Sequence, residues 1–411
     1  MNLVLAWKHV KANRGSAGVD GLSIGETEEL LKTAWPRIRD ELQSGKYRPQ
    51  PVRRVQIQKP GGGERELGIP TVTDRLIQQA LLQVLQPLID PTFSDFSYGF
   101  RPGRRAHDAV LQAQRYVQEG YRKVVDVDLE KFFDRVNHDI LMDRLSKRIA
   151  DKAVLRLVRR YLAAGILDQG VASERTEGTP QGGPLSPLLA NVLLDEVDRA
   201  LERRGLRFVR YADDCNVYVR SVQAGKRVLN GLRKLYGRLC LKVNEAKTAV
   251  ASAFGRKFLG YSFWTAPKGA VQRAVARKAK DTFKTRVRQI TRRSGGRSMS
   301  QVVDALRQYV PGWKAYFLLA QTPRVFRELD EWLRHRLRAM QLKQWRRGKT
   351  VYRELRALGA PPLHAAQAAS ETRSWWSNSH MVVNRYLPIA YFDRLGVHQA
   401  LRGSQAQRRR S

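Results

Sequence analysis

The stretch Arg207–Val219, which reads RFVRYADDCNVYV, contains two adjacent aspartates between two runs of β-branched and aromatic residues. Runs of this kind predict two β-strands, and the short polar segment between them predicts a tight turn. Asp213 and Asp214 therefore lie at the tip of a predicted hairpin. Taken alone, an Asp-Asp turn is more often a solvated loop than a site.

A third predicted strand, Lys123–Leu129, carries two further acids. Because side chains alternate along a strand, Asp126 and Asp128 share one face. If this strand lies beside the hairpin, Asp128 meets Asp213 and Asp214, and their repulsion requires neutralising cations. Carboxylate oxygens suit Mg²⁺. Two such ions about 4 Å apart activate a hydroxyl and stabilise a leaving oxygen, which is the chemistry of phosphoryl transfer.

The composition indicates a polyanionic partner. The 411 residues carry 75 Lys and Arg against 38 Asp and Glu, a net charge of +37, which favours a nucleic acid as the partner over the plainer alternatives of ribosome-style packing on RNA or a solvated basic surface. A chain of this length, 42 % hydrophobic, predicts two or three folded domains. The two cysteines have no paired spacing and predict neither a zinc site nor a disulfide framework. With no signal peptide and no long apolar run, we expect a cytoplasmic protein without a membrane partner.

Residues 271–360 form the most basic part of the chain, with 23 Lys and Arg against 6 Asp and Glu. Their periodicity predicts three amphipathic helices near 272–293, 299–320 and 324–345. Aromatic side chains are interleaved with the basic ones, as in an RNA-binding bundle. We expect most of these aromatics to be core residues and the Arg and Lys faces to carry the binding.

Several ordered blocks resemble one family. They are AGVDG (17–21), LGIP (67–70), YGFRPG (98–103), GTPQGGPLSP (178–187), YADD (211–214), NEAKT (244–248) and FLGY (258–261). The YADD block looks like the signature of reverse transcriptases. Together, over nearly the whole chain, the blocks resemble the reverse transcriptase–maturase encoded by bacterial group II introns.

This resemblance implies an α+β fold, with an antiparallel palm sheet, fingers from the N-terminal half and a helical thumb. The implied domains are fingers and palm at 1–264, a thumb or maturase domain at 265–355, and a short basic extension at 356–411. The implied activity is RNA-directed DNA synthesis for intron retrohoming, together with assistance to splicing. The implied partners are group II intron RNA, a DNA target with its primer, and dNTPs, on the DNA of the bacterial nucleoid.

The resemblance also assigns site residues. Asp128, Asp213 and Asp214 match the catalytic metal ligands for two Mg²⁺ ions, with Mn²⁺ as an alternative, and the Leu129 carbonyl is a further candidate ligand. Phe133 matches the aromatic under the sugar of the incoming nucleotide, where a ring selects deoxynucleotides.

Other matched positions concern the nucleotide and the nucleic acid. Phe132 is the alternative aromatic for sugar selection. Each of the two rings is also consistent with simple packing in the core. The remaining nucleotide-binding candidates are Lys59, Arg65, Gln181 and Lys247. Arg75 and Arg101 are candidate template or primer contacts, and each is equally consistent with a structural ion pair.

Two departures from the family bear on function. No Cys/His-rich nuclease segment follows the thumb, so we expect the primer to come from elsewhere, such as a replication fork. The first motif also lies unusually close to the N-terminus, which raises the question of a missing or misassigned start. Two alternatives stay open: a host-recruited reverse transcriptase in defence or repair, and a splicing cofactor whose DNA synthesis is incidental. An RNA-dependent RNA polymerase would share the metal chemistry, but Phe133 argues against it.

Overall fold

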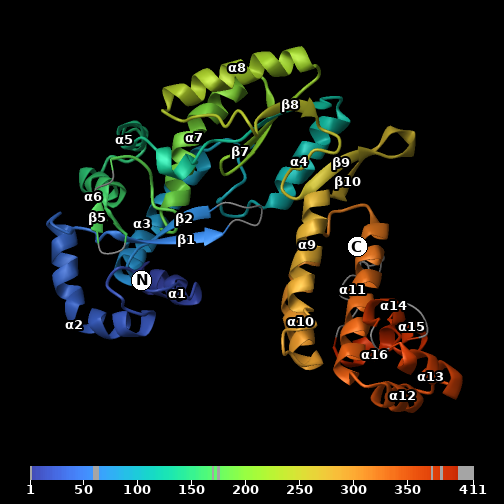
Figure 1. Ribbon diagram of the computed structural model, residues 1–411. Helices are drawn as coiled ribbons and strands as arrows, with labels where there is room; N and C mark the ends of the chain where they lie inside the picture. Colours follow the sequence, from blue (N-terminus) through green and yellow to red (C-terminus); the bar gives the residue numbers. More distant parts are fainter. Residues whose placement is uncertain are drawn as a thin grey trace. The chain divides into compact units, whose positions relative to one another are not determined.

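The computed structural model of the chain describes residues 2–58, 64–168, 171–173, 176–371, 374–379 and 383–396. These residues form two compact units, Met1–Ala253 and Phe254–Ser411, each with its own apolar core (Figure 1). The observed division lies before the sequence-based boundary at 264, because the strand Tyr261–Thr265 pairs within the second unit. The division of the chain into three domains stays a prediction.

The first unit, called the catalytic unit below, alternates helices and strands. Its described helices are α1 (Asn2–Ala12), α2 (Ile24–Gln43), α3 (Val72–Ile89), α4 (Ala106–Gln118), α5 (His138–Ser146), α6 (Lys152–Ala163), α7 (Ser186–Arg203) and α8 (Val222–Arg238), with short 3-10 turns at Asp90–Thr92 and Phe132–Arg135. Its described strands are β1 (Val52–Gln58), β2 (Glu64–Ile69), β3 (Lys123–Val127), β4 (Ile166–Asp168), β5 (Val171–Ser173), β6 (Arg207–Tyr211), β7 (Asp214–Val219) and β8 (Ala249–Ser252).

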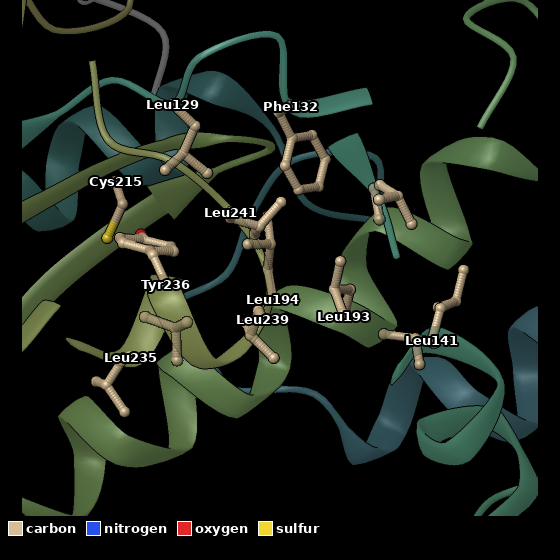
Figure 2. Close-up of a cluster of buried hydrophobic side chains, with 14 of the residues drawn as sticks. Leu129, Phe132, Leu141, Leu193, Leu194, Cys215, Leu235, Tyr236, Leu239 and Leu241 are labelled. Atoms are coloured by element: carbon tan, nitrogen blue, oxygen red, sulfur yellow. The ribbon is translucent and has the colours of Figure 1, made fainter. Parts of the chain in front are cut away.

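An antiparallel sheet in the order β6-β7-β3-β8 forms the centre of this unit. Helices α7 and α8 cover one of its faces because both present continuous apolar surfaces. Figure 2 shows Leu193 of α7 beside Leu141 of α5, with Leu194 of α7 and Leu235 and Tyr236 of α8 in the same core. Burying side chains of this size is worth about 1.5–3 kcal/mol each, so the core fixes the position of the strand ends.

A second sheet, in the order β2-β1-β4-β5, joins the N-terminal segments to the middle of the chain. Strands β1 and β2 are antiparallel, whereas β1 and β4 pair in parallel. Helix α1 packs against α3, and the Asn2 side chain donates to the Ala80 carbonyl at 3.0 Å. The start of the chain is thereby tied to the helix that follows β2.

The second unit, called the basic unit below, is a helical bundle with one small hairpin. Its described strands are β9 (Tyr261–Thr265) and β10 (Val271–Val275). Its described helices are α9 (Arg277–Ile290), α10 (Met299–Tyr316), α11 (Pro323–Trp345), α12 (Gly348–Ala357), α13 (Pro362–Ser370), α14 (Trp375–Asn378), α15 (Val383–Tyr386) and α16 (Ile389–Arg394), with a 3-10 turn at Pro267–Gly269. None of the helices in the described part of the chain is long and apolar enough to cross a membrane.

The predicted α+β class is confirmed, with the aspartate hairpin in an antiparallel sheet and a helical C-terminal part. One element differs from the prediction. A helix was expected from residue 272, but Val271–Val275 is a strand and the helix begins at Arg277. The strand forms because Val271 and Val275 are buried against β9, a pairing that local periodicity does not reveal.

Candidate active site

The adjacent aspartates lie where the sequence predicts them, at a two-residue turn. Strands β6 and β7 pair Tyr211 with Asp214, so Ala212 and Asp213 form the turn. Ala212 has φ +58°, a left-handed conformation that costs an L-residue about 1–2 kcal/mol. Such a turn persists only where the surroundings hold it, and its carboxylates project from the sheet end.

Strand β3 brings the third aspartate to the same end of the sheet. It pairs antiparallel with β7, with Val127 opposite Cys215, and the next pair in this register is Asp128 opposite Asp214. The segment before β8 holds the Asp128 backbone: the Asn244 N–H donates to the Asp128 carbonyl at 2.8 Å, and the Asp128 N–H donates to Thr248 Oγ1 at 3.2 Å. The sheet thus brings the three aspartates to one end.

The charges at this sheet end include one lysine. Lys247 Nζ lies 3.6 Å from Asp128 Oδ1, and the lysine side chain is 65 % exposed. In the described part of the chain, no three His, Cys, Asp or Glu side chains are already gathered as a metal-binding group. The donors themselves fit a hard divalent cation, because all three are carboxylates. Neighbouring carboxylates of this kind repel each other until a cation lies between them.

A buried ion pair supports the turn from below. Arg210 and Asp198 have fully buried side chains, and Arg210 Nη2 lies 2.6 Å from Asp198 Oδ2. Arg210 Nη1 donates to the Ala212 carbonyl at 2.9 Å and to Asn191 Oδ1 at 2.9 Å. Burial raises the pKa of the Asp198 carboxyl, although the Arg210 guanidinium opposes that shift. Because these bonds end on the turn itself, they fix its left-handed residue.

Sequence reasoning missed this ion pair. The signal was present, because Arg210 follows Phe208 on the buried face of β6, where an arginine requires a buried acceptor. Asp198 was harder to find, since its pairing with Arg210 depends on how α7 packs on the sheet. The network therefore adds positioning residues that the motif does not contain.

A cavity of about 420 Å³ lies in the same unit. Its lining includes Arg75, Phe100, Phe133 and Gln181. Of the two candidate aromatics for sugar selection, Phe132 is 3 % exposed and packs in the core, as Figure 2 shows, whereas Phe133 is half-buried and lines the cavity. The structure therefore makes Phe133 the available ring of the two.

The Gln181 loop is held beside β2. The Gly68 N–H donates to the Gln181 carbonyl at 3.0 Å. Gly182, next in the chain, has φ +137°, and a Cβ there would lie 2.8 Å from the Gly68 carbonyl oxygen. Only glycine fits this conformation and this close backbone approach. The close approach of Gly182 to Gly68 therefore holds the neighbouring Gln181 at the cavity.

The two candidate template or primer arginines differ. Arg75 is half-buried at the cavity, where its Nη2 donates to the Ser16 carbonyl at 2.7 Å and burial lowers the pKa of its guanidinium. Arg101 has a side chain only 3 % exposed, paired with Asp90 at 2.9 Å. Arg101 also donates to the Ser97 carbonyl at 3.0 Å. These contacts match the ion-pair alternative for Arg101, and a nucleic-acid contact for this residue stays a prediction.

The other sequence-based candidates have separate outcomes. Lys59 lies outside the described residues. Arg65 belongs to β2, but its side chain also lies outside them. Leu129 packs its side chain in the core and forms an isolated bridge with Val243. The assignments of these residues, and that of Lys247, stay predictions.

Comparisons with known proteins agree with the ordered motifs. Residues 57–263 match the family described as "Reverse transcriptase (RNA-dependent DNA polymerase)", and residues 280–359 match "Group II intron, maturase-specific domain". Protein YkfC of Escherichia coli (strain K12) is 34 % identical over 287 residues, which cover 59 % of this chain and 74 % of YkfC. Group II intron-encoded protein LtrA of Lactococcus lactis subsp. cremoris is 36 % identical over 245 residues, covering 58 % of this chain and 40 % of LtrA.

A solved structure was also compared with the chain. A chain of a partial Cas6-RT-Cas1–Cas2 complex is 26 % identical, with a TM-score of 0.38, and the match covers 57 % of this chain and 41 % of that chain. The chain spans 40 % of the length of LtrA, and 74 % of that of YkfC.

Proposed function

Because the chain belongs to the reverse transcriptase family and carries a group II intron maturase-specific domain, we propose that it copies intron RNA into DNA and holds that RNA during splicing. The observation that carries the catalytic part is the β3–β7 register, in which Val127 lies opposite Cys215, so that Asp128 follows at the sheet end that carries Asp213 and Asp214. The product of such copying, inserted at a DNA target, is the basis of retrohoming.

The chemistry assigned to the three aspartates is phosphoryl transfer. Bound at these carboxylates, divalent cations, for which we propose Mg²⁺ with Mn²⁺ as a substitute, lower the charge barrier between hydroxyl and phosphate. The chain itself supplies the rigid ligand set and its spacing. Lys247 lies beside Asp128 and is 65 % exposed, and we assign its ammonium to a phosphate of the incoming dNTP.

The nucleotide is assigned to the cavity and its surroundings. Phe133 closes the space under the sugar, where a 2′-hydroxyl would collide with the ring, and Gln181 offers an amide to the nucleotide. Lys59 and Arg65, at the β1–β2 connection, are assigned to the triphosphate. Under this assignment the protein uses deoxynucleotides in preference to ribonucleotides, and this preference depends on the Phe133 ring.

Primer extension on an RNA template tests the polymerase proposal. Wild-type protein with Mg²⁺ and dNTPs should extend the primer, rNTPs should be poor substrates, and Asp213→Ala should give no product. A suitable control is Asp95→Ala, which removes an exposed carboxylate paired with Arg104 in the same unit. Thermal unfolding of both variants checks that they fold. Absence of wild-type DNA synthesis on RNA, or full activity of Asp213→Ala, contradicts the proposal.

The RNA-holding role is assigned to a cation cluster in the basic unit, formed by Lys284, Arg288 and Arg336 around Trp332. The three cationic groups lie 5.7, 5.5 and 5.5 Å from the centre of the indole ring. Within the described residues, none of the three has a carboxylate at ion-pair distance. They lie in the segment that matches the maturase-specific domain.

The electrostatics of the cluster favour an external anion. Burial lowers the pKa of the Arg336 guanidinium, and repulsion from Arg293 and Arg288 lowers it further. Lys284 and Arg288 are also four residues apart on α9, where like charges destabilise a helix by about 0.2–0.5 kcal/mol per pair. A phosphate backbone would relieve this repulsion, which is the physical reason for assigning RNA to this surface.

The dependence of RNA affinity on salt concentration tests this assignment. A variant with Lys284, Arg288 and Arg336 changed to Gln should bind a structured intron RNA more weakly, with a slope of log K against log salt that is shallower by about 2–3. A matched control changes Arg324 and Arg353, which pair with Glu328 and Glu354. Equal changes in slope for the two variants would indicate diffuse attraction and contradict a defined cluster.

A splicing assay separates the two proposed roles. Asp213→Ala should still assist splicing of the intron RNA while making no DNA, because the cation cluster is intact. The triple Gln variant should lose splicing assistance. If Asp213→Ala abolishes both activities in a folded protein, the roles are not separable in the way proposed.

A further inference from the structure

Phe100 has an unusual backbone conformation for an aromatic residue. Its φ is +60°, in the left-handed region that bulky L-residues rarely adopt. Its side chain is 46 % exposed and lines the cavity that also contains Phe133 and Gln181. A strained backbone that presents an apolar ring to an open cavity, instead of burying it, has no benefit for folding.

The residue before it is fixed against the catalytic turn. The Gly99 carbonyl accepts a hydrogen bond from Asn191 Nδ2 at 2.9 Å. A Cβ on Gly99 would overlap the backbone nitrogen of Ala212, so the two backbones are in direct contact. The Tyr98 N–H donates to the Arg210 carbonyl and the Arg210 N–H donates to the Phe96 carbonyl, both at 2.9 Å, so two bonds join this segment to the sheet. Phe100 is thereby placed at a fixed distance from the aspartate turn.

The residue after it is fixed independently. Arg101 is enclosed by Asp90 and by the carbonyls of Ser94 and Ser97, with three of its nitrogens engaged. With Gly99 held on one side and Arg101 on the other, the chain between them has little freedom. The left-handed φ of Phe100 follows from these two anchors, and they direct its ring into the cavity.

The character of the cavity indicates what the ring meets. The lining around Phe100 is largely apolar, with Leu67, Phe133 and Pro184, and includes a single cationic side chain, that of Arg75. Lys247, the described lysine near the aspartates, is not part of it. A flat, weakly polar group with a polar edge fits such a lining better than a triphosphate does.

We propose that Phe100 is a stacking surface for a nucleobase of the nascent base pair, held in register with the catalytic aspartates by the Gly99 and Arg101 anchors. The proposal rests on the proposed polymerase function. An aromatic face stacks on any of the four bases, so it supports the pair without reading its sequence. The base belongs either to the template or to the incoming dNTP, and the two have the same stacking chemistry.

Replacement of Phe100 by Asn separates stacking from folding. Asn tolerates a left-handed φ, so Phe100→Asn should unfold at the same urea concentration as wild type or at a higher one. Primer extension should nevertheless show kcat/KM lowered about 10-fold, equivalent to about 1.4 kcal/mol. Phe100→Trp should retain activity within about threefold, since it keeps a stacking face. The control is Leu88→Asn, which introduces the same polar side chain at a residue that is 67 % exposed and lies outside the cavity.

A template with an abasic site at the templating position identifies the base. If Phe100 stacks on the template base, wild type and Phe100→Asn become equal on this template. If it stacks on the incoming base, the difference persists there as a raised KM for the dNTP. Wild-type activity in Phe100→Asn on normal templates, or an activity loss matched by a loss of stability, would overturn the proposal.

A binding measurement keeps the proposal testable without catalysis. Stacking on an aromatic ring changes the fluorescence of 2-aminopurine, placed either in the template or as the incoming nucleotide. Wild type should alter this fluorescence in one of the two positions, and Phe100→Asn should not. If wild type makes no DNA but changes the fluorescence through Phe100, only the polymerase proposal fails. If neither position responds to Phe100, the stacking proposal fails.

Discussion

Two pairs of arginines, one pair in each unit of the chain, are used in opposite ways. In the catalytic unit, Arg210 is fully buried and pairs with Asp198, and Arg101 is enclosed beside Asp90. In the basic unit, Arg288 and Arg336 surround Trp332 without a carboxylate at ion-pair distance among the described residues. Buried, paired arginines position a backbone turn, whereas unpaired ones keep their charge available to an external anion. The difference predicts which substitutions cost stability and which cost binding.

The largest expected effect concerns the buried pair. Arg210→Met should lower the free energy of unfolding of the catalytic unit by about 3–5 kcal/mol, because Asp198 is left buried without a partner. Urea unfolding followed by circular dichroism measures this. The double variant Arg210→Met with Asp198→Leu should recover much of the stability, since apolar residues often replace a buried ion pair well.

DNA synthesis should not recover with stability in that double variant. The carbonyl of Ala212 and the Asn191 side chain lose their donor, so the turn that carries Asp213 is no longer held. Restored primer extension in the double variant would contradict a positioning role for Arg210. Wild-type stability of Arg210→Met alone would contradict the energetic reasoning.

A smaller effect is expected at Gly99. Gly99→Ala places a methyl group against the backbone of Tyr211 and Ala212, which has no flexible end that can move away. We expect a loss of about 1–3 kcal/mol in unfolding free energy, together with reduced DNA synthesis. Gly103→Asn is the matched control in the same motif, because Gly103 has φ +69° but open space around it. If both variants cost the same stability, the close approach at Gly99 is not the cause.

At Lys284, stability and binding should separate. Lys284→Gln removes a cation–π contact with Trp332 and also removes repulsion from Arg288. The two changes have small and opposite effects on the unfolding free energy. The unfolding free energy should therefore stay within about 0.5 kcal/mol of wild type, while affinity for a structured RNA falls. A large loss of stability here would remove the contrast between the two units.

The smallest expected effect concerns the reactivity of the two cysteines. Cys215 is buried in β7, where burial raises the pKa of its thiol to about 12, whereas Cys240 is exposed. In the folded protein at about pH 8, a thiol reagent should modify one cysteine quickly and the other only after unfolding. Since both lie in the catalytic unit, the slow reaction should accelerate in Arg210→Met and not in Lys284→Gln. Equal rates for both thiols in wild type would contradict the buried position of Cys215.

The aspartate hairpin was predictable because its signals are local. Alternating side chains in Arg207–Val219 define both strands, and the polar pair between them defines the turn. The strand β10 was not predictable, since Val271–Val275 reads equally well as the first turn of a helix. Its conformation is decided by pairing with β9, which sequence periodicity does not contain.

The candidate site was partly predictable for the same reason. Motif position placed Phe133 among the candidates, but only packing distinguishes it from Phe132, which enters the core. For Arg101 the sequence left two roles open, and its ion pair could not be foreseen because its acceptors, among them Asp90 and Ser94, belong to a segment whose path is not encoded by spacing. Phe100 was overlooked, since a left-handed φ has no sequence signature at an aromatic residue.

The β3–β7 register is tested most directly by two substitutions on one strand. Asp126 and Asp128 lie two residues apart. Asp126 pairs with Asn216 inside the sheet, whereas Asp128 follows the last pair, Val127 with Cys215, at the end that carries Asp214. Single-nucleotide incorporation on an RNA template, titrated with Mg²⁺, should be at least about 100-fold slower for Asp128→Asn, or about 2.7 kcal/mol. Asp126→Asn should stay within about threefold of wild type. Equal rates for the two variants, or an active Asp128→Asn, would contradict the assignment of the catalytic centre to this register.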